Sequence, residues 1–377
     1  MEKKSKVIIF ALGGNEISPI EIDKNTGKLI IQDLPAQWKR TAKTCELIAD
    51  FIKDNQDCYY IVTHGNGPQI GNILLRSEYS SPHLFKLPLD VCGADSQGAL
   101  GYMIAQLSNS LKIRNLDITT AEIITQVEVD SDDLAFRNPT KFIGPALSKE
   151  HAQSLMSKSS SFTAKYYKML EKSEISNTNI NQEVWRRVVP SPKPIGIVEI
   201  DIIEACYLSG NIPITVGGGG IPVVKVTPQK SKNHETYMCN YGISYKRSNL
   251  ETKKYASIFK GVEGVIDKDL SSSLLAKTIL ERSIARGHQI EVEFVILTNV
   301  DSVKLNFQKA NETNISILSL EEATSIFKSN EFQEGSMGPK IESILNFLNA
   351  GGKKAYITKV ELLEETFSGK AGTTFIN

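Results

Sequence analysis

The chain has 377 residues, 41% of them hydrophobic, enough for two ordinary domains or one large α/β domain. Lys and Arg number 43 and match 43 Asp and Glu, which argues against a nucleic-acid or polybasic membrane partner. No apolar run reaches membrane-spanning length, and the five cysteines are scattered without a Cys-x-x-Cys pair. We therefore expect a cytoplasmic protein with reduced thiols and no signal peptide.

The first predicted element is a strand at 7–12, an unbroken apolar run that ends at Gly13 and Gly14. A run this short suits a strand covered on both faces, as in a parallel sheet. The two glycines let backbone N–H groups converge on an anion, and Asn15 adds a neutral donor. Taken alone, a Gly-Gly pair after a strand more often marks an ordinary turn.

Two later strands end in the same way. The predicted strand at 59–63 runs into His-Gly-Asn-Gly-Pro at 64–68, and the one at 212–216 runs into four glycines at 217–220. Ligands of open α/β sheets bind beyond the carboxyl ends of the strands, so these three turns predict one phosphate-rich site. None of them is a Walker A loop or a spaced dinucleotide fingerprint.

The remaining elements follow from apolar spacing. Helices are predicted at 37–51, 69–77, 99–111, 199–208, 272–280, 321–329 and from Lys340 to Leu348. Strands are predicted at 118–129, at 262–266 before a charged triplet, at 292–297, and at 355–357, where the sheet should close. The polar stretch 153–183 predicts a surface helix and a mobile loop within an inserted lobe, and 225–257 predicts a second insertion.

Three lysines stand beside predicted strand ends or tight turns, where a fixed cation could stabilise the charge of a phosphoryl group in transfer. Lys141 follows Asn-Pro-Thr, Lys268 lies between Asp267 and Asp269, and Lys340 follows Gly-Pro. Each could equally be a solvated surface lysine. The Asp-Lys-Asp triplet is the hardest to dismiss, because it directly follows a predicted buried strand. An aspartate there could orient lysines or bind Mg²⁺.

His64 is the obvious candidate for a general base. No acid and nucleophile accompany it in a recognisable motif, so we interpret it as a structural histidine. The sequence contains no Gly-x-Ser-x-Gly elbow and no zinc-ligand spacing, and we predict no metal centre made by the protein alone. An alcohol acceptor would need a base. An acceptor that is already an anion would not.

These motifs resemble those of the carbamate kinases, of the amino-acid kinase superfamily. Eight stretches match in family order, and they cover most of the chain outside the two polar insertions: 11–15, 64–69, 88–94, 138–141, 186–194, 217–222, 261–269 and 335–340. Any one of them could be chance, but the ordered set is highly specific.

The resemblance implies an open, mostly parallel sheet sandwiched by helices. It implies an N-terminal substrate lobe at 1–283, with a protruding subdomain at 130–190 and the insertion at 225–257, and a C-terminal nucleotide-binding lobe at 284–377. It further implies reversible phosphoryl transfer between ATP and carbamate, giving ADP and carbamoyl phosphate. Relatives often run this reaction toward ATP in the arginine deiminase pathway. Mg²⁺ would accompany the nucleotide, and a homodimer is the family expectation.

The resemblance also assigns residues to roles, position by position. Catalysis would fall to Lys141, Lys268, Asp269 and Lys340. The substrate phosphoryl group would bind to Gly13, Gly14, Asn15, Gly65, Asn66, Gly67, Gly218 and Gly219. The nucleotide would bind to Thr298, Asp301, Met337 and Lys340. Sister kinases carry a lysine before the first glycine pair, where Ala11 and Leu12 stand here, and Lys141 is expected to compensate.

Three departures from the family pattern stand out. Asp95 replaces a usual Met, an Asn-Gln-Glu-Val segment at 181–184 replaces an Asp-x-Gly-Arg/Lys-Gly stretch, and the insertion at 225–257 is long. Two alternatives to a carbamate kinase therefore stay open. One is an amino-acid kinase paralogue acting on another small acid, and the other is a catalytically weak, nucleotide-binding regulator of the same fold.

Overall fold

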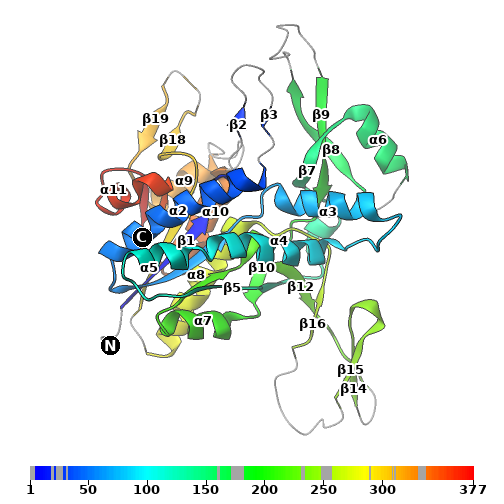
Figure 1. Ribbon diagram of the computed structural model, residues 1–377, viewed down its shortest axis with the longest axis horizontal. Helices are drawn as coiled ribbons and strands as arrows, with labels where there is room; N and C mark the ends of the chain where they lie inside the picture. Colours follow the sequence, from blue (N-terminus) through cyan, green and yellow to red (C-terminus); the bar gives the residue numbers. More distant parts are fainter. Residues whose placement is uncertain are drawn as a thin grey trace.

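The central element is an eight-stranded sheet, seen in a computed structural model of the protein (Figure 1). The structure describes residues 5–17, 21–22, 29–30, 33–158, 162–170, 182–230, 234–247, 257–287, 290–307, 309, 311–329 and 337–377. The strand order is β20 (Ile317–Ser319), β22 (Thr373–Ile376), β21 (Lys354–Thr358), β17 (Glu291–Leu297), β1 (Lys6–Leu12), β4 (Cys58–His64), β11 (Ile212–Thr215) and β5 (Thr120–Ile123). Neighbours from β21 to β5 are parallel, so the predicted mostly parallel sheet is confirmed.

The sheet does not close at 355–357 as predicted. Strand β21 pairs with β22 in the antiparallel direction, and β22 pairs in parallel with β20. The C-terminal strand is only a few residues long, and its single large buried side chain, Phe375, gives too weak a pattern to predict from sequence.

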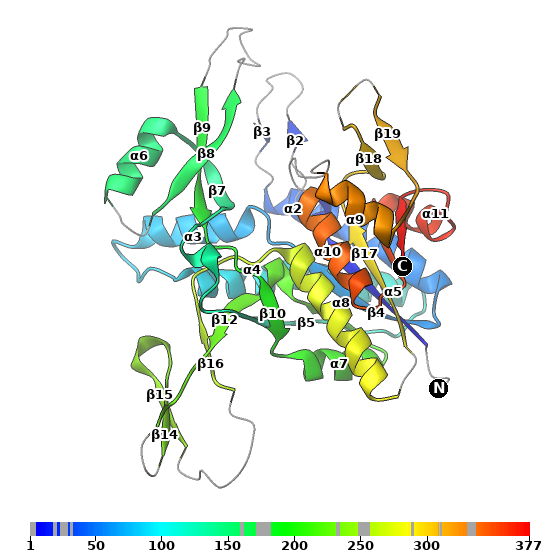
Figure 2. The ribbon, with the colours of Figure 1, turned by 180° about the vertical axis from the view of Figure 1, so that it is seen from behind.

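Strand β1 is covered on both faces, as its apolar run predicts. Val7, Ile9 and Ala11 belong to one core cluster, and their alternating neighbours Ile8 and Phe10 belong to the other. The first cluster lies under α7 (Ile200–Leu208), α8 (Lys268–Ala285), α9 (Leu320–Lys328) and α10 (Met337–Asn349), which Figure 2 shows in front of the sheet. The second lies under α2 (Leu34–Asp54), α4 (Leu89–Ile104), α5 (Leu107–Ile113) and α11 (Leu363–Phe367).

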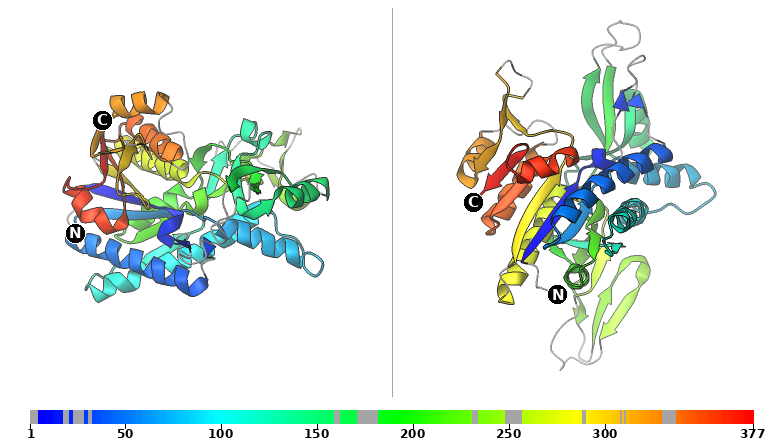
Figure 3. Two further views of the ribbon diagram at one scale, coloured as in Figure 1. Left: turned by 90° about the horizontal axis from the view of Figure 1, so that it is seen from above. Right: turned by 60° about the vertical axis from the view of Figure 1, so that its left-hand side comes forward.

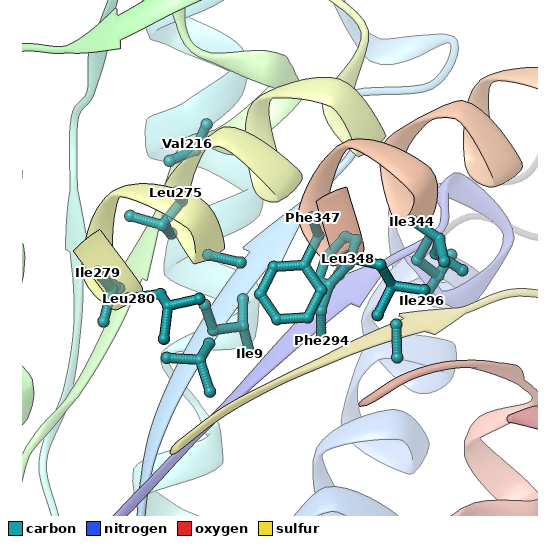
Figure 4. Packing of buried hydrophobic residues seen from close by; sticks show 14 of the residues in the cluster. Ile9, Val216, Leu275, Ile279, Leu280, Phe294, Ile296, Ile344, Phe347 and Leu348 are labelled. Atoms are coloured by element: carbon teal, nitrogen blue, oxygen red, sulfur yellow. The ribbon is translucent and has the colours of Figure 1, made fainter. Parts of the chain in front are cut away.

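Aromatic rings hold α10 on the sheet. The ring of Phe347 meets that of Phe294, on β17, edge to face with centroids 5.9 Å apart (Figure 4). Both side chains are fully buried, and burying an aromatic or aliphatic side chain of this size contributes about 1.5–3 kcal/mol. Lys340 lies on the same helix, so this packing also fixes the helix that carries a predicted catalytic lysine.

The predicted strand at 118–129 is in fact two strands that belong to two sheets. After β5 the chain passes through Ile124 and Thr125 into β6 (Gln126–Val129) of a four-stranded sheet. That sheet has the order β10 (Pro194–Ile197), β6, β12 (Ile221–Lys225) and β16 (Phe259–Gly261). Both strands satisfy the same local β pattern, and only tertiary pairing separates them.

Helix α4 begins ten residues before the predicted start at 99, and the helical segment breaks before α5. The motif at 88–94 therefore lies on a helix, whose N-cap position is Pro88. Gly93 and Gly98 lower helix propensity in this segment, which is why apolar spacing alone did not reveal it.

Two three-stranded sheets project from the main body (Figures 1 and 3). The protruding subdomain has the strand order β7 (Lys141–Ser148), β9 (Gln182–Val189) and β8 (Ala164–Leu170), with α6 (Lys149–Lys158) packed on it. Strand β8 lies where a loop was predicted, and residues 171–181 of that predicted loop lie outside the described part. The insertion at 225–257 forms β13 (Gln229–Lys230), β14 (Glu235–Met238) and β15 (Ser244–Arg247), on the opposite side of the molecule.

The other elements are short or connect these layers. They are α1 (Gly14–Ile17), β2 (Glu21–Ile22), β3 (Leu29–Ile30), α3 (Gln69–Ser80), η1 (Leu134–Phe136), η2 (Gly217–Gly219), η3 (Asn240–Gly242), β18 (Val303–Leu305), β19 (Thr313–Ile315) and η4 (Val360–Leu362). None of the helices in the described ranges is both long and apolar enough to cross a membrane. The division into lobes at residue 283 stays a prediction, since the sheet runs continuously from β17 to β1.

Candidate active site

The turns after β1 and β4 meet at the end of β17. The amide of Gly13 donates to the Leu297 carbonyl at 2.8 Å, and the amide of Gly65 donates to the Leu12 carbonyl at 3.1 Å. A Cβ atom on Gly13 would lie 2.9 Å from the Leu297 carbonyl oxygen, which is a clash with backbone. Glycine is therefore needed for the two strand ends to approach this closely.

The tetraglycine turn packs against the same place. Val216 adopts a left-handed backbone with φ 54°, a conformation that strains a β-branched residue, and Gly218 follows at φ 64°. A Cβ atom on Gly218 would lie 2.3 Å from Nδ2 of Asn66, and one on Gly219 would lie 2.5 Å from the Ile266 carbonyl oxygen. The predicted turns thus come together, with Asn66 buried between them.

Lys268 is the first residue of α8. The prediction of a strand at 262–266, just before it, is wrong. Val265 and Ile266 are buried, but their backbone is irregular, and the nearest strand, β16, ends at Gly261. Asp267 is the N-cap of α8, and its Oδ1 accepts from the Asp269 amide at 2.9 Å. The Val265 amide donates to the Pro190 carbonyl at 2.9 Å, but no regular strand ladder forms. A sequence pattern cannot distinguish such a buried apolar segment from a strand.

Two lysines share one buried carboxylate. Lys268 Nζ bonds to Oδ1 of Asp269, and Lys340 Nζ lies 3.3 Å from Oδ2 of the same group. Burial would raise the pKa of Asp269, but the two ammonium groups hold its pKa at about 2. Burial lowers the pKa of Lys268, with Lys340 adding to the effect and Asp269 opposing it. Two ammonium groups against one carboxylate leave a positive charge, which suits an incoming phosphoryl group.

Lys268 also touches the turn after β4. A Cβ atom on Gly65 would lie 2.8 Å from Cδ of Lys268, so the lysine stem lies along that glycine. The cationic cluster and the glycine turns therefore form one site, which lies beyond the carboxyl ends of β1 and β4.

Lys141 joins this site from the protruding subdomain. Its Nζ lies 2.7 Å from Oδ2 of Asp267, the residue that caps α8, although the two residues are 126 positions apart. The Lys141 side chain is one-third exposed, so it is less confined than the side chains of Lys268 and Lys340.

The predicted nucleotide residues are more dispersed. Thr298 is buried, its amide donates to the Thr358 carbonyl at 2.9 Å, and its Cα lies 3.7 Å from where a Cβ on Gly13 would stand. Asp301 is 60% exposed and pairs with Lys359. Met337 begins α10, while residues 335–336 and the side chain of Asn15 lie outside the described part.

A buried pair behind the turns was not found from the sequence. His64 is fully buried, its Nδ1 lies 3.0 Å from the Gly65 carbonyl oxygen, and its Nε2 lies 3.8 Å from Oε2 of Glu122. Burial raises the pKa of Glu122, and His64 opposes that shift. The interpretation of His64 as structural agrees with this burial, but nothing in the sequence pointed to Glu122, which lies on a different strand.

A second polar clamp holds the tetraglycine turn. The Gln97 side chain accepts from the Thr125 amide at 2.8 Å and donates to the Thr125 carbonyl at 3.1 Å. The Thr125 hydroxyl in turn lies 3.0 Å from the Val216 amide and 2.7 Å from the Thr215 hydroxyl. These residues position the turn without reaching the cationic cluster. Asp95, on the same helix as Gln97, is exposed.

The arrangement suits a reaction that needs positive charge and bare backbone rather than a covalent intermediate. Within the described ranges no three or more His, Cys, Asp or Glu side chains gather as metal ligands. All five cysteines are described and are free thiols. A mostly parallel α/β sheet with such a cationic site beyond its strand ends fits the class of the phosphotransferases.

Comparison with known proteins specifies the family. No protein-family model matches the chain. It is 34% identical over 377 residues to carbamate kinase of Thermococcus kodakarensis, covering 98% of this chain and 99% of the relative. It is 34% identical over 374 residues to the carbamate kinase-like protein YqeA of Escherichia coli, covering 98% of both. A solved structure of carbamate kinase from Giardia lamblia bound to AMP-PNP is 30% identical, covers 99% of both chains and has a TM-score of 0.74. The chain belongs to the carbamate kinase family.

Proposed function

We propose that the protein catalyses reversible phosphoryl transfer between ATP and carbamate, giving ADP and carbamoyl phosphate. The observation that carries this proposal is the pair of lysines, Lys268 and Lys340, on the single buried carboxylate of Asp269. That cluster touches the glycine turn after β4, where a small phosphorylated substrate would find both backbone donors and positive charge.

The glycine turns and the lysines of the site would have different roles in the reaction. The turns at Gly13–Gly14, Gly65–Gly67 and Gly218–Gly219 would hold the phosphoryl group, and Gly218 packs against Asn66. A carbamate oxygen attacks the γ-phosphorus as the bond from that phosphorus to the ADP oxygen breaks. Lys268, Lys340 and Lys141 would neutralise the charge that spreads over the transferred oxygens. Carbamate is already an anion, so no general base is required, in keeping with the burial of His64.

The nucleotide would bind on the β17 side, at Thr298, Asp301, Met337 and Lys340. The Giardia relative was solved with AMP-PNP, a nucleotide with the triphosphate length of ATP. Mg²⁺ binds in such sites mainly through substrate phosphates and water, with one or two carboxylates. Asp267 and Asp269 are the carboxylates beside the lysine cluster, and Asp301 is the carboxylate on the nucleotide side. All three pair with lysines, so we infer that the ion arrives with the nucleotide.

A coupled assay for ATP formed from ADP and carbamoyl phosphate, with and without Mg²⁺, tests the reaction. ATP formation that needs Mg²⁺ and is lost in Lys340→Ala is the expected result. Lys277→Ala is the matched control, because that lysine lies on the outer side of α8 in an ion pair with Glu281. Folded protein that forms no ATP at saturating substrates contradicts the proposal.

A kinase for a different small acid is the second candidate. The Escherichia coli relative that is named carbamate kinase-like is as similar as the Thermococcus enzyme, so similarity does not decide between the two substrates. A panel of acetate, glutamate, aspartate and carbamate, assayed for ADP release, distinguishes them. Activity with carbamate alone supports the first proposal. ATP binding without turnover of any acid would instead favour the nucleotide-binding regulator.

Three wider proposals go beyond the reaction: two rest on the family alone, and the third, the location, rests also on the scattered free cysteines. They are operation toward ATP in the arginine deiminase pathway, a homodimeric state and a cytoplasmic location. Measuring the mass of the purified protein in solution tests the dimer, and comparing the catalytic rates in both directions tests the preference for ATP synthesis.

A further inference from the structure

A cavity of about 400 Å³ lies between α3 and the protruding subdomain, and none of its lining residues belongs to the cationic site. We call it the subdomain cavity. Its walls are largely apolar, and the apolar side chains come from α3, β7, α6 and the segment just before β8: Leu74, Leu75, Leu147, Leu155 and Phe162. This size and lining are typical of sites for small organic ligands.

The cavity adjoins a close backbone contact between the subdomain and α3. A Cβ atom on Gly71, in α3, would lie 2.3 Å from the backbone nitrogen of Gly144, in β7. The guanidinium of Arg186 donates twice to the Gly144 carbonyl, at 2.8 and 3.1 Å. Gly71 and Gly144 both line the cavity, and Lys141 lies three residues before Gly144 on β7. A ligand in the cavity would therefore contact β7, the strand that carries Lys141, and could shift it.

The polar groups of the cavity carry an excess of positive charge. Glu78 accepts from Arg187 at 2.7 Å and lies 3.1 Å from Lys86 Nζ, so two cations share one carboxylate. Burial would raise the pKa of Glu78, but the two cations hold its pKa below the usual value, so it is ionised at neutral pH. The Nε atom of Arg187 is buried and has no hydrogen-bond partner among the described residues, while the guanidinium lies over the Phe162 ring at 5.0 Å.

We propose that the subdomain cavity binds a small monocarboxylate with an apolar body. The carboxylate would pair with Arg187 and Lys86, and the apolar body would lie against Leu74, Leu75 and Phe162. An amine would meet the excess positive charge, and a phosphate would leave the apolar walls unfilled. By spanning α3 and β7, the bound acid would regulate the enzyme through the placement of Lys141.

The test uses the full-length protein and three eight-carbon probes, octanoate, octan-1-ol and octylamine, titrated by calorimetry. Octanoate should bind with one-to-one stoichiometry and about tenfold tighter than octanol, since hydrogen bonds to charged groups give that difference. Octylamine should bind most weakly. Lys86→Gln should narrow the ratio between octanoate and octanol. Equal or tighter binding of octanol, or no binding of octanoate, overturns the carboxylate site.

Two variants locate the binding. Leu75→Trp fills the cavity from the half-buried side of α3, so octanoate binding should be lost while the melting temperature stays near that of the wild type. Ile113→Ser is the control, because it removes an 81% exposed side chain on α5 that does not line the cavity. Octanoate binding that survives Leu75→Trp, or that falls in Ile113→Ser, overturns the placement.

Regulation has a separate readout. Octanoate should change the KM for carbamoyl phosphate in the wild type and leave it unchanged in Leu75→Trp. Binding without any change in KM or kcat overturns the regulatory role. The calorimetric result does not depend on the proposed reaction, so an inactive protein would leave the binding test intact.

Discussion

Lys141 Nζ lies 2.7 Å from Oδ2 of Asp267, which joins the first strand of the protruding subdomain to the N-cap of α8. One carboxylate therefore caps the helix with Oδ1 and holds the subdomain lysine with Oδ2. The subdomain is thereby connected to the helix that carries Lys268 and Asp269, and Lys141 stands next to the cluster without belonging to it.

Lys141→Ala should reduce kcat for ATP formation by roughly 10²–10³-fold, the loss typical of one preorganised charge contact. Unfolding free energy should fall by less than about 1 kcal/mol, because the ion pair with Asp267 is partly exposed. Steady-state kinetics and urea unfolding on one preparation measure both. Lys149→Ala, which removes an exposed lysine of the same subdomain, is the control. Near-normal kcat in Lys141→Ala would remove Lys141 from the catalytic residues.

Lys268→Ala should lower kcat much more than it raises KM for carbamoyl phosphate, the pattern of an interaction made mainly in the transition state. The loss should again be on the order of 10²–10³-fold. Kinetics and melting temperature are compared with those of Lys277→Ala on the same helix. A variant that melts early but keeps full kcat would mean that Lys268 only stabilises the start of α8.

Asp269→Asn should lower the unfolding free energy at pH 7 by about 3–5 kcal/mol, because it removes the buried carboxylate with which both Lys268 and Lys340 pair. The pKa of Asp269 is held at about 2, below its usual value of 3.8, so its stabilising effect is present above pH 3.8 and fades as the pH falls toward 2. The difference between wild type and variant should accordingly shrink between pH 5 and pH 2. Urea unfolding of both proteins across that pH range measures the difference in unfolding free energy. A difference that stays constant with pH would contradict an ionised Asp269 in the folded protein.

Gly65→Ala places a Cβ atom 2.8 Å from Cδ of Lys268, so the lysine must shift and kcat should fall. The matched control is Gly98→Ala on α4, where a Cβ atom meets no atom within 4 Å. That control should be more stable by roughly 0.5–1 kcal/mol through helix propensity and should keep its activity. Equal activity in both variants would show that the lysine stem adapts freely.

Glu122→Gln tests the buried pair behind the turns. Burial raises the pKa of Glu122, so the folded protein retains this proton above the ordinary carboxyl range, and stability falls as the pH rises through the shifted pKa. The glutamine variant has no such proton to lose. Its melting temperature relative to the wild type should therefore rise between pH 5 and pH 8, as differential scanning calorimetry can measure. A falling difference would indicate that an ionised Glu122 stabilises the folded protein.

Much of the fold was predictable, because apolar runs such as that of β1 and helical spacing such as that of α2 are local signals. The positions of Gly65 and Lys268 near strand or helix ends were likewise visible in the sequence. The contacts between them were not. The passage from β5 to β6, the Lys141–Asp267 pair and the Glu122–His64 pair all depend on which distant segments meet. Val265 and Ile266 show the converse, since a buried apolar run predicted a strand that tertiary packing made irregular.

The place of β1 in the sheet has a consequence for biosynthesis. One edge of β1 pairs with β4, which is synthesised soon after β1. The other edge pairs with β17, which begins only at residue 291. Until the nascent chain has passed residue 297, that second edge of an apolar strand has no native partner. Unpaired edges of this kind recruit other chains, and pairings between distant segments form slowly. Products of premature termination before β17 should therefore aggregate, and the protein should depend on chaperones until its last quarter emerges.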